Sequence, residues 1–130
     1  MSRALISNMD NLSCLKLFSL YGFNIGIFKP GQKGWKKIPN PKEMHRQEGS
    51  SVLLPVNPPY DKWQIMLMGG GDTVGNHITN KTEIMRFDSN FEKTPQFEEY
   101  VPMKFHRYYV YAVILPDQNI LVAGGKGGRR

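Results

Sequence analysis

The chain has 130 residues, of which 40% are hydrophobic and 12% aromatic, so it is not a disordered chain and is long enough for one domain with a core. Its 17 basic and 11 acidic residues give a net charge of +6. The basic residues are scattered and no aromatic-interleaved basic motif appears, so we expect no nucleic-acid partner. With 13 Gly and 9 Pro punctuating short β-rich runs, we expect an all-β fold.

Residues 1–22 show no clear pattern and remain unassigned, with a leader, a helix and a frayed end as alternatives. The apolar stretch 12–20 is interrupted by Lys16 and is too short to cross a membrane, so we expect no membrane partner. It also makes a poor signal peptide, because no clear cleavage site follows it. Cys14 is the only cysteine, which excludes an intrachain disulfide and a cysteine-based zinc site. The compartment is not assigned from the sequence.

Two short strands are predicted in the next segment, 23–41. Phe23–Phe28 alternates between apolar and other residues, which is typical of a strand. Trp35–Ile38 is a second, shorter strand that prolines end. The spacing of Phe28 and Trp35 predicts that their rings stack across a hairpin-like connection.

A complete four-stranded sheet is predicted over about residues 49–101. Trp63 to Met68 is an apolar run, which indicates a strand buried on both faces. Lys81–Phe87 alternates, so Ile84 and Thr82 are expected to point inward. The four predicted strands are 50–56, 63–68, 81–87 and 98–101.

A two-strand unit occurs twice in the chain. Each copy is an apolar strand that ends in Leu-Pro, a turn, and a second apolar strand that runs into glycines. The midpoints of the copies lie about 55 to 60 residues apart, which is a repeat period of a propeller blade. The second copy predicts a partial sheet over 106–128. The first copy is Gly49-Ser-Ser-Val-Leu-Leu-Pro55 with Gln64-Ile-Met-Leu-Met-Gly-Gly-Gly71, and the second is Val110-Tyr-Ala-Val-Ile-Leu-Pro116 with Asn119-Ile-Leu-Val-Ala-Gly-Gly125.

This pattern resembles kelch repeats over about residues 25–128, and more narrowly the central domain of the galactose oxidase and glyoxal oxidase family of copper radical oxidases. The kelch-like features are the glycine pairs that end the second strands and the aromatic pair Phe28 and Trp35. The resemblance implies about two kelch-type β-propeller blades, each an antiparallel four-stranded sheet, in an incomplete ring. The narrower resemblance rests on Gly49–Pro55, Met68–Asp72, Thr82–Ile84, Val113–Asp117 and Leu121–Gly125.

The copper site of that family is not complete in this sequence. In the family, two tyrosines and two histidines hold one copper, and one of the tyrosines is crosslinked to a cysteine and carries a radical that oxidises alcohols or aldehydes and yields peroxide. The family element Arg-x-Tyr-His corresponds here to Arg107-Tyr-Tyr-Val110, so Tyr109 matches the tyrosine and Val110 replaces the histidine. Cys14 matches no crosslinking segment. The resemblance therefore implies no cofactor and no catalytic residue for this chain, although family members are copper enzymes and often secreted.

The histidines form no local metal motif, because His45, His77 and His106 are far apart in the sequence. A metal site from His106 and Tyr109 would need a bulge between them and further ligands from elsewhere. His77 is expected to be a solvated loop histidine, and Asp72 is expected to cap loop amides after the glycines. The candidates for a binding surface are Tyr60, Trp63, Asp72, His77 and Tyr108.

We therefore expect a structural propeller fragment without an active site of its own, which is not an active enzyme alone. Open blade faces and strand edges would be covered by other copies of the chain or by the rest of a propeller, so we expect an oligomer. The alternative is a small kelch-type module that binds a protein or a carbohydrate, and a third possibility is a distinct small β-fold. Clustering of Tyr60, Trp63 and Tyr108 on one exposed face would favour binding, and burial of all three would favour the structural role.

Overall fold

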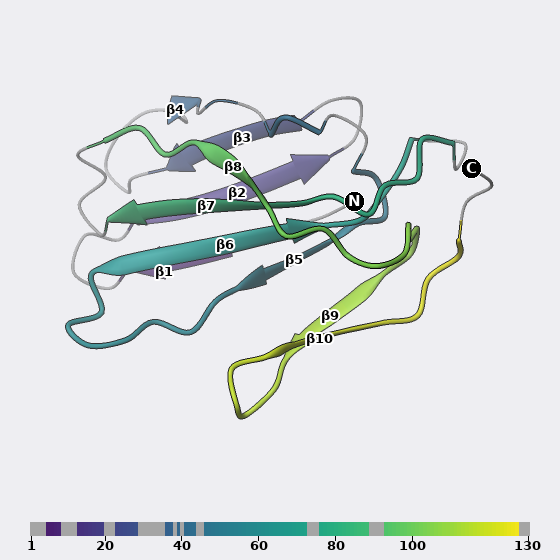
Figure 1. The fold of residues 1–130 in the computed structure, drawn as a ribbon. Coiled ribbons are helices and arrows are strands. Elements are labelled where there is room, and N and C mark those ends of the chain that lie inside the picture. Colours follow the sequence, from purple (N-terminus) through teal and green to yellow (C-terminus); the bar gives the residue numbers. More distant parts are fainter. Residues whose placement is uncertain are drawn as a thin grey trace.

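The structure is a computed structural model, and it describes residues 5–8, 13–19, 23–28, 36–37, 39, 41–43, 46–72, 76–88 and 93–127. In these residues the chain is all-β, with ten strands in three antiparallel sheets and no helix (Figure 1). No helix that could cross a membrane occurs among them. The strands are β1 (Leu5–Asn8), β2 (Ser13–Ser19), β3 (Phe23–Phe28), β4 (Lys36–Lys37), β5 (Ser50–Leu53), β6 (Lys62–Met68), β7 (Thr82–Asp88), β8 (Phe97–Tyr100), β9 (Tyr111–Ile114) and β10 (Ile120–Ala123).

The N-terminal sheet has the order β1-β2-β3-β4. Strand β3 was predicted with the correct bounds, and β4 is shorter than the predicted Trp35–Ile38. Strands β1 and β2 lie in the segment that was left unassigned. The partial sheet predicted at 23–41 is therefore wrong, because β3 and β4 belong to a sheet of four strands. The predicted stacking of Phe28 on Trp35 falls outside the side chains that are described.

The central sheet has the order β5-β6-β7-β8, and its two inner strands are each buried on both faces along part of their length. The residues from Ile65 to Met68 are all buried, as the apolar run predicted. Thr82 and Ile84 are buried as expected, but Glu83 and Met85 between them are buried too. The half-buried alternation predicted for this strand is therefore wrong, because layers cover both sides of the sheet.

One face of the central sheet packs against the hairpin β9–β10, which Figure 1 shows below β5 in yellow-green. Residues 41–43 and Arg46 lie against the other face, where the backbone N–H of Lys42 donates to Glu83 Oε1 at 2.6 Å. The core between central sheet and hairpin contains Val52, Met66, Met68 and Ile84, with Leu54, Met103, Ala112, Ile114, Ile120 and Val122 packed against them.

The repeat seen in the sequence is present in the backbone. We call residues 46–71 the first unit and residues 107–126 the second unit. The same positions adopt left-handed backbone conformations in both units, and each unit is closed by one isolated β-bridge. The matched positions are Glu48 and Tyr109 (φ 55° and 57°), Gly69 and Gly124 (65° and 70°), and Gly70 and Gly125 (98° and 91°); the matched bridges are Gln47 with Gly71 and Tyr108 with Lys126.

The turns inside the two units also begin and end alike. In the first unit, Leu54 N donates to Gln64 O at 2.9 Å; in the second, Leu115 N donates to Asn119 O at 2.8 Å. The shorter second turn is held by Asp117, whose side chain accepts bonds from the backbone and the side chain of Asn119. These bonds lower the pKa of the Asp117 carboxyl, and the bond from the backbone N–H of Asn119 makes the largest contribution.

Candidate functional site

The first group of candidate residues lies at the glycine end of β6. Asp72 Oδ1 accepts the backbone N–H of Asn76 at 2.7 Å, which confirms the predicted capping of a loop amide. His77 Nδ1 lies 2.9 Å from Asp72 Oδ2, and the imidazole is largely exposed. An exposed loop histidine was predicted, but its pairing with Asp72 was not.

Tyr108 lies beneath this pair and is buried, which differs from the exposed position expected of a binding residue. Its hydroxyl donates to the backbone oxygen of Asp72 at 3.2 Å, and its ring meets that of Tyr109 edge-on with centroids 4.5 Å apart. Burial raises the pKa of the Tyr108 hydroxyl, and the neighbouring Tyr109, Glu48 and Asp72 raise it further. The hydroxyl is therefore a neutral donor at physiological pH, and its role in the geometry is to hold the loop.

The second group lies at the opposite end of β6. Tyr60 is 60% exposed in the turn before this strand, and Trp63 is half-buried near its start. Strand β6 has seven residues, so its ends are about 20 Å apart at about 3.3 Å per residue. Tyr60, Trp63 and Tyr108 therefore neither cluster on one exposed face nor are all buried.

The two residues considered as metal ligands, His106 and Tyr109, contact different partners. His106 Nδ1 lies 2.8 Å from the backbone oxygen of Ile78, which makes this nitrogen the donor. Tyr109 packs on Tyr108 and is otherwise exposed. Within the described ranges no group of three or more His, Cys, Asp or Glu is placed to hold a metal ion. His45 lies outside the described residues.

A buried ion pair joins the first unit to β7, and sequence reasoning missed it. Arg46 Nη2 lies 2.8 Å from Glu83 Oε2, and both side chains are almost fully buried. The same guanidinium donates through Nη1 to the backbone oxygens of Gly69 (3.1 Å) and Lys81 (2.9 Å). Glu83 also accepts the backbone N–H groups of Lys42 and Glu43. The Glu83 carboxylate of β7 therefore accepts from the Arg46 guanidinium and from two backbone amides.

The most distinctive exposed surface is the outer hairpin face, formed by Tyr111, Val113 and Leu121. Register pairs Leu121 with Val113, so these side chains project from the same face of β9–β10. The opposite face of the hairpin packs on the central sheet. Leu121 and Val113 therefore form an apolar surface that points away from the rest of the described chain.

In the first unit, the residues equivalent to this surface are covered by another sheet. Val113 corresponds to Val52 of the first unit, and Leu121 corresponds to Met66. Val52 and Met66 are each 8% exposed beneath the hairpin, whereas Val113 is 54% exposed and Leu121 is 48% exposed. The second unit thus presents to solvent the positions that, in the first unit, form a packed interface between sheets.

Comparison with known proteins does not assign the chain to a family. Neither the protein-family models nor the curated proteins compared with the chain give a match. The functional interpretation therefore rests on the repeat and on the outer hairpin face.

Proposed function

We propose that this chain is a structural stacking module, a fragment of propeller-like sheets whose outer hairpin face associates with a further sheet. The observation that carries the proposal is that Val113 and Leu121 are exposed where Val52 and Met66 are covered. Burial of apolar surface stabilises association by about 25 cal/mol per Å², so a solvent-exposed copy of a packed face favours assembly.

The repeat also indicates which face of the hairpin would receive an added sheet. The inner hairpin face packs on the central sheet, and the outer face corresponds to the side of the central sheet that receives the hairpin. A sheet added to the outer face would continue the same arrangement, as blades do in a propeller. The kelch-like sequence features are consistent with this arrangement, and we propose no copper site for the chain itself.

The test is the mass of the chain in solution, measured by light scattering after size exclusion. We expect the wild-type chain to be larger than a monomer, and Val113→Lys to weaken its association by at least tenfold, because a lysine in an apolar interface must be desolvated.

The matched control is Phe105→Lys, since Phe105 is 57% exposed but lies outside the outer hairpin face. We expect this variant to associate like the wild type. A wild-type monomer, or equal effects of the two lysines, would refute stacking through this face. Peroxide formed from an aldehyde after copper loading would refute the absence of an active site.

A further inference from the structure

We propose that the edge of β10 accepts an added extended strand that reads Glu-x-apolar on its inner face, and that this strand places a carboxylate on Arg107. The proposal deepens the stacking function and rests on it, because it names the partner that completes the second unit. Three observations support it: the position of Arg107, the edge of β10, and an apolar groove beside that edge.

Arg107 occupies in the second unit the position that Arg46 occupies in the first. Arg46 donates to the backbone oxygen of Gly69, and Arg107 donates to that of Gly124, the equivalent glycine. Arg46 is completed by Glu83 from the third strand of its sheet. Arg107 has no carboxylate partner in the part of the chain that the structure describes. The guanidinium is thus already oriented by the bond from its Nη1 to the backbone oxygen of Gly124.

The edge of β10 is the one to which a third strand would add. Strand β6 pairs with β5 on one side and with β7 on the other. Strand β10 is the equivalent of β6, and among the described strands it pairs with β9 alone. Its second edge therefore presents backbone donors and acceptors of the kind used in recognition by strand addition.

Register fixes where the carboxylate would lie. Glu83 pairs with Leu67 across β6 and β7, and Leu67 corresponds to Val122. A glutamate opposite Val122 would therefore be placed relative to Arg107 as Glu83 is placed relative to Arg46. Two residues further along, the equivalent of Met85 would lie opposite Ile120 and on the same face as the carboxylate.

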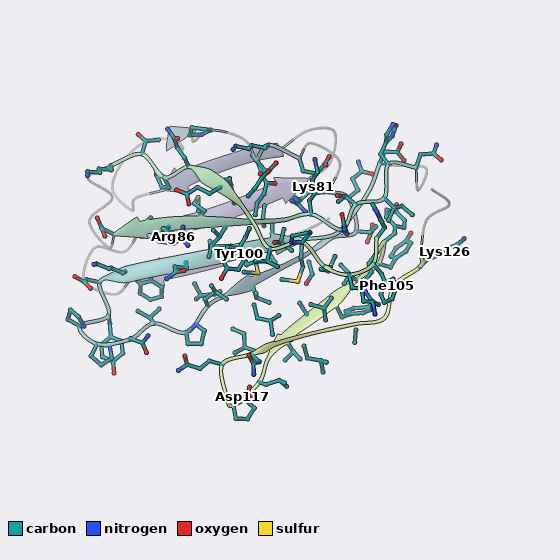
Figure 2. The ribbon with its side chains drawn as sticks, viewed as in Figure 1. Lys81, Arg86, Tyr100, Phe105, Asp117 and Lys126 are labelled. Atoms are coloured by element: carbon teal, nitrogen blue, oxygen red, sulfur yellow. The ribbon has the colours of Figure 1, made fainter. Side chains whose placement is uncertain are left out.

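An apolar groove of about 370 Å³ lies on that face, between the hairpin and the central sheet. Ile120 and Val122 line it from β10, and Met66, Met68 and Tyr100 line it from the central sheet. Figure 2 labels Tyr100 on this side of the central sheet. The groove would receive the apolar side chain that follows the glutamate, so the partner strand should read Glu-x-apolar on its inner face.

The probe for the experiment is a fluorescent synthetic peptide with the sequence of residues 80–88, which contains β7, and the measurement is its anisotropy with the full chain. We expect saturable binding, and we expect the peptide carrying Glu83→Gln to bind at least tenfold more weakly, since a charge-assisted bond in a partly buried site is lost. In the protein, Arg107→Gln should remove the difference between the two peptides.

The control protein carries Arg86→Gln, because Arg86 is an exposed arginine whose partner is the exposed Glu98. It should keep the preference for glutamate, and circular dichroism should show the same β-signal for all the variants. Absence of binding, or equal affinity for the Glu and Gln peptides, would overturn the inference. Light scattering on the wild-type chain and on Val113→Lys separates the two proposals, since sensitivity to Val113→Lys would persist if only the strand-addition inference failed.

Discussion

At the scale of single residues, Arg46 and Glu83 form an ion pair that is almost fully buried. Two charges are removed from water, which is costly unless nearly every donor and acceptor is satisfied. Here Glu83 accepts from Arg46 and from two backbone amides, and Arg46 also donates to two carbonyl groups. The pair therefore orders residues 42–43, the glycine turn and β7 relative to one another.

Glu83→Gln should destabilise the fold by about 3–5 kcal/mol, because it leaves the buried guanidinium without its counter-charge. The measurement is urea unfolding followed by tryptophan fluorescence. Glu98→Gln is the matched control: its pair with Arg86 is exposed, so the expected loss is at most about 1 kcal/mol. Equal losses in the two variants would contradict the role assigned to Glu83.

The raised pKa of the Tyr108 hydroxyl predicts that the stability of the fold depends on pH in the alkaline range. Since burial raises the pKa of its hydroxyl above the usual value of 10.0, the folded state holds this proton more tightly than the unfolded state does. The resulting stabilisation is complete below pH 10 and is lost as the pH rises through the folded-state pKa.

Tyr108→Phe tests this dependence. The variant should lose about 0.5–1.5 kcal/mol at pH 7 with the bond to Asp72, and its stability should fall less between pH 9 and pH 11 than that of the wild type. Tyr60→Phe serves as the control, since Tyr60 is exposed. Parallel pH curves for the wild type and Tyr108→Phe would show that the hydroxyl does not contribute.

At the scale of elements, the two units depend on a glycine turn with a left-handed backbone. Gly70 has φ 98° and donates its N–H to the backbone oxygen of Arg107 at 2.9 Å, so it joins the first unit to the second. A Cβ at this position would lie 2.7 Å from the Cα of Arg46. The close approach of two backbones explains the glycine there in physical terms.

Gly70→Ala should therefore cost at least about 1–3 kcal/mol, through both backbone strain and the clash with Arg46. Gly127→Ala is the matched control, because a Cβ on Gly127 would meet no atom within 4 Å. Thermal unfolding of the two variants gives the comparison. A Gly70→Ala variant as stable as Gly127→Ala would contradict the geometry of the turn.

Strand positions from Ser50 onward were predictable, because alternation, apolar runs and Gly or Pro boundaries are local signals. Strand β2 was missed because its apolar stretch is interrupted by Lys16, and it was weighed as a leader or a helix. The pair Arg46–Glu83 was missed because its members lie 37 residues apart, and local sequence patterns carry no signal of a contact over that separation. Of the proposed binding residues, Asp72 and His77 do meet, whereas the burial of Tyr108 depended on its β-bridge to Lys126.

At the scale of the whole molecule, the sheets follow one another in a single direction, with the outer hairpin face as the last surface of the described part. Association through this face would be driven by apolar burial, whereas strand addition at Arg107 includes an ion pair. The two events therefore respond differently to salt.

Raising sodium chloride from 0.1 M to 1 M should leave self-association unchanged or strengthen it, and should weaken binding of the β7 peptide. Light scattering and anisotropy on the same preparation give both results. Dissociation of the oligomer at 1 M salt would indicate that charge, and not the outer hairpin face, holds the copies together.

The two units agree at their glycine ends but differ in the turn between their strands, which covers residues 54–61 in the first and 115–119 in the second. Figure 2 shows Asp117 at the tip of the second turn and Lys126 at the far end of the hairpin. The glycine ends are fixed by backbone contacts, while the tips have changed length without altering the strands that they connect. The tip near Tyr60 is therefore the place where an affinity tag or a reporter peptide can be inserted into this chain with the least disturbance to its fold.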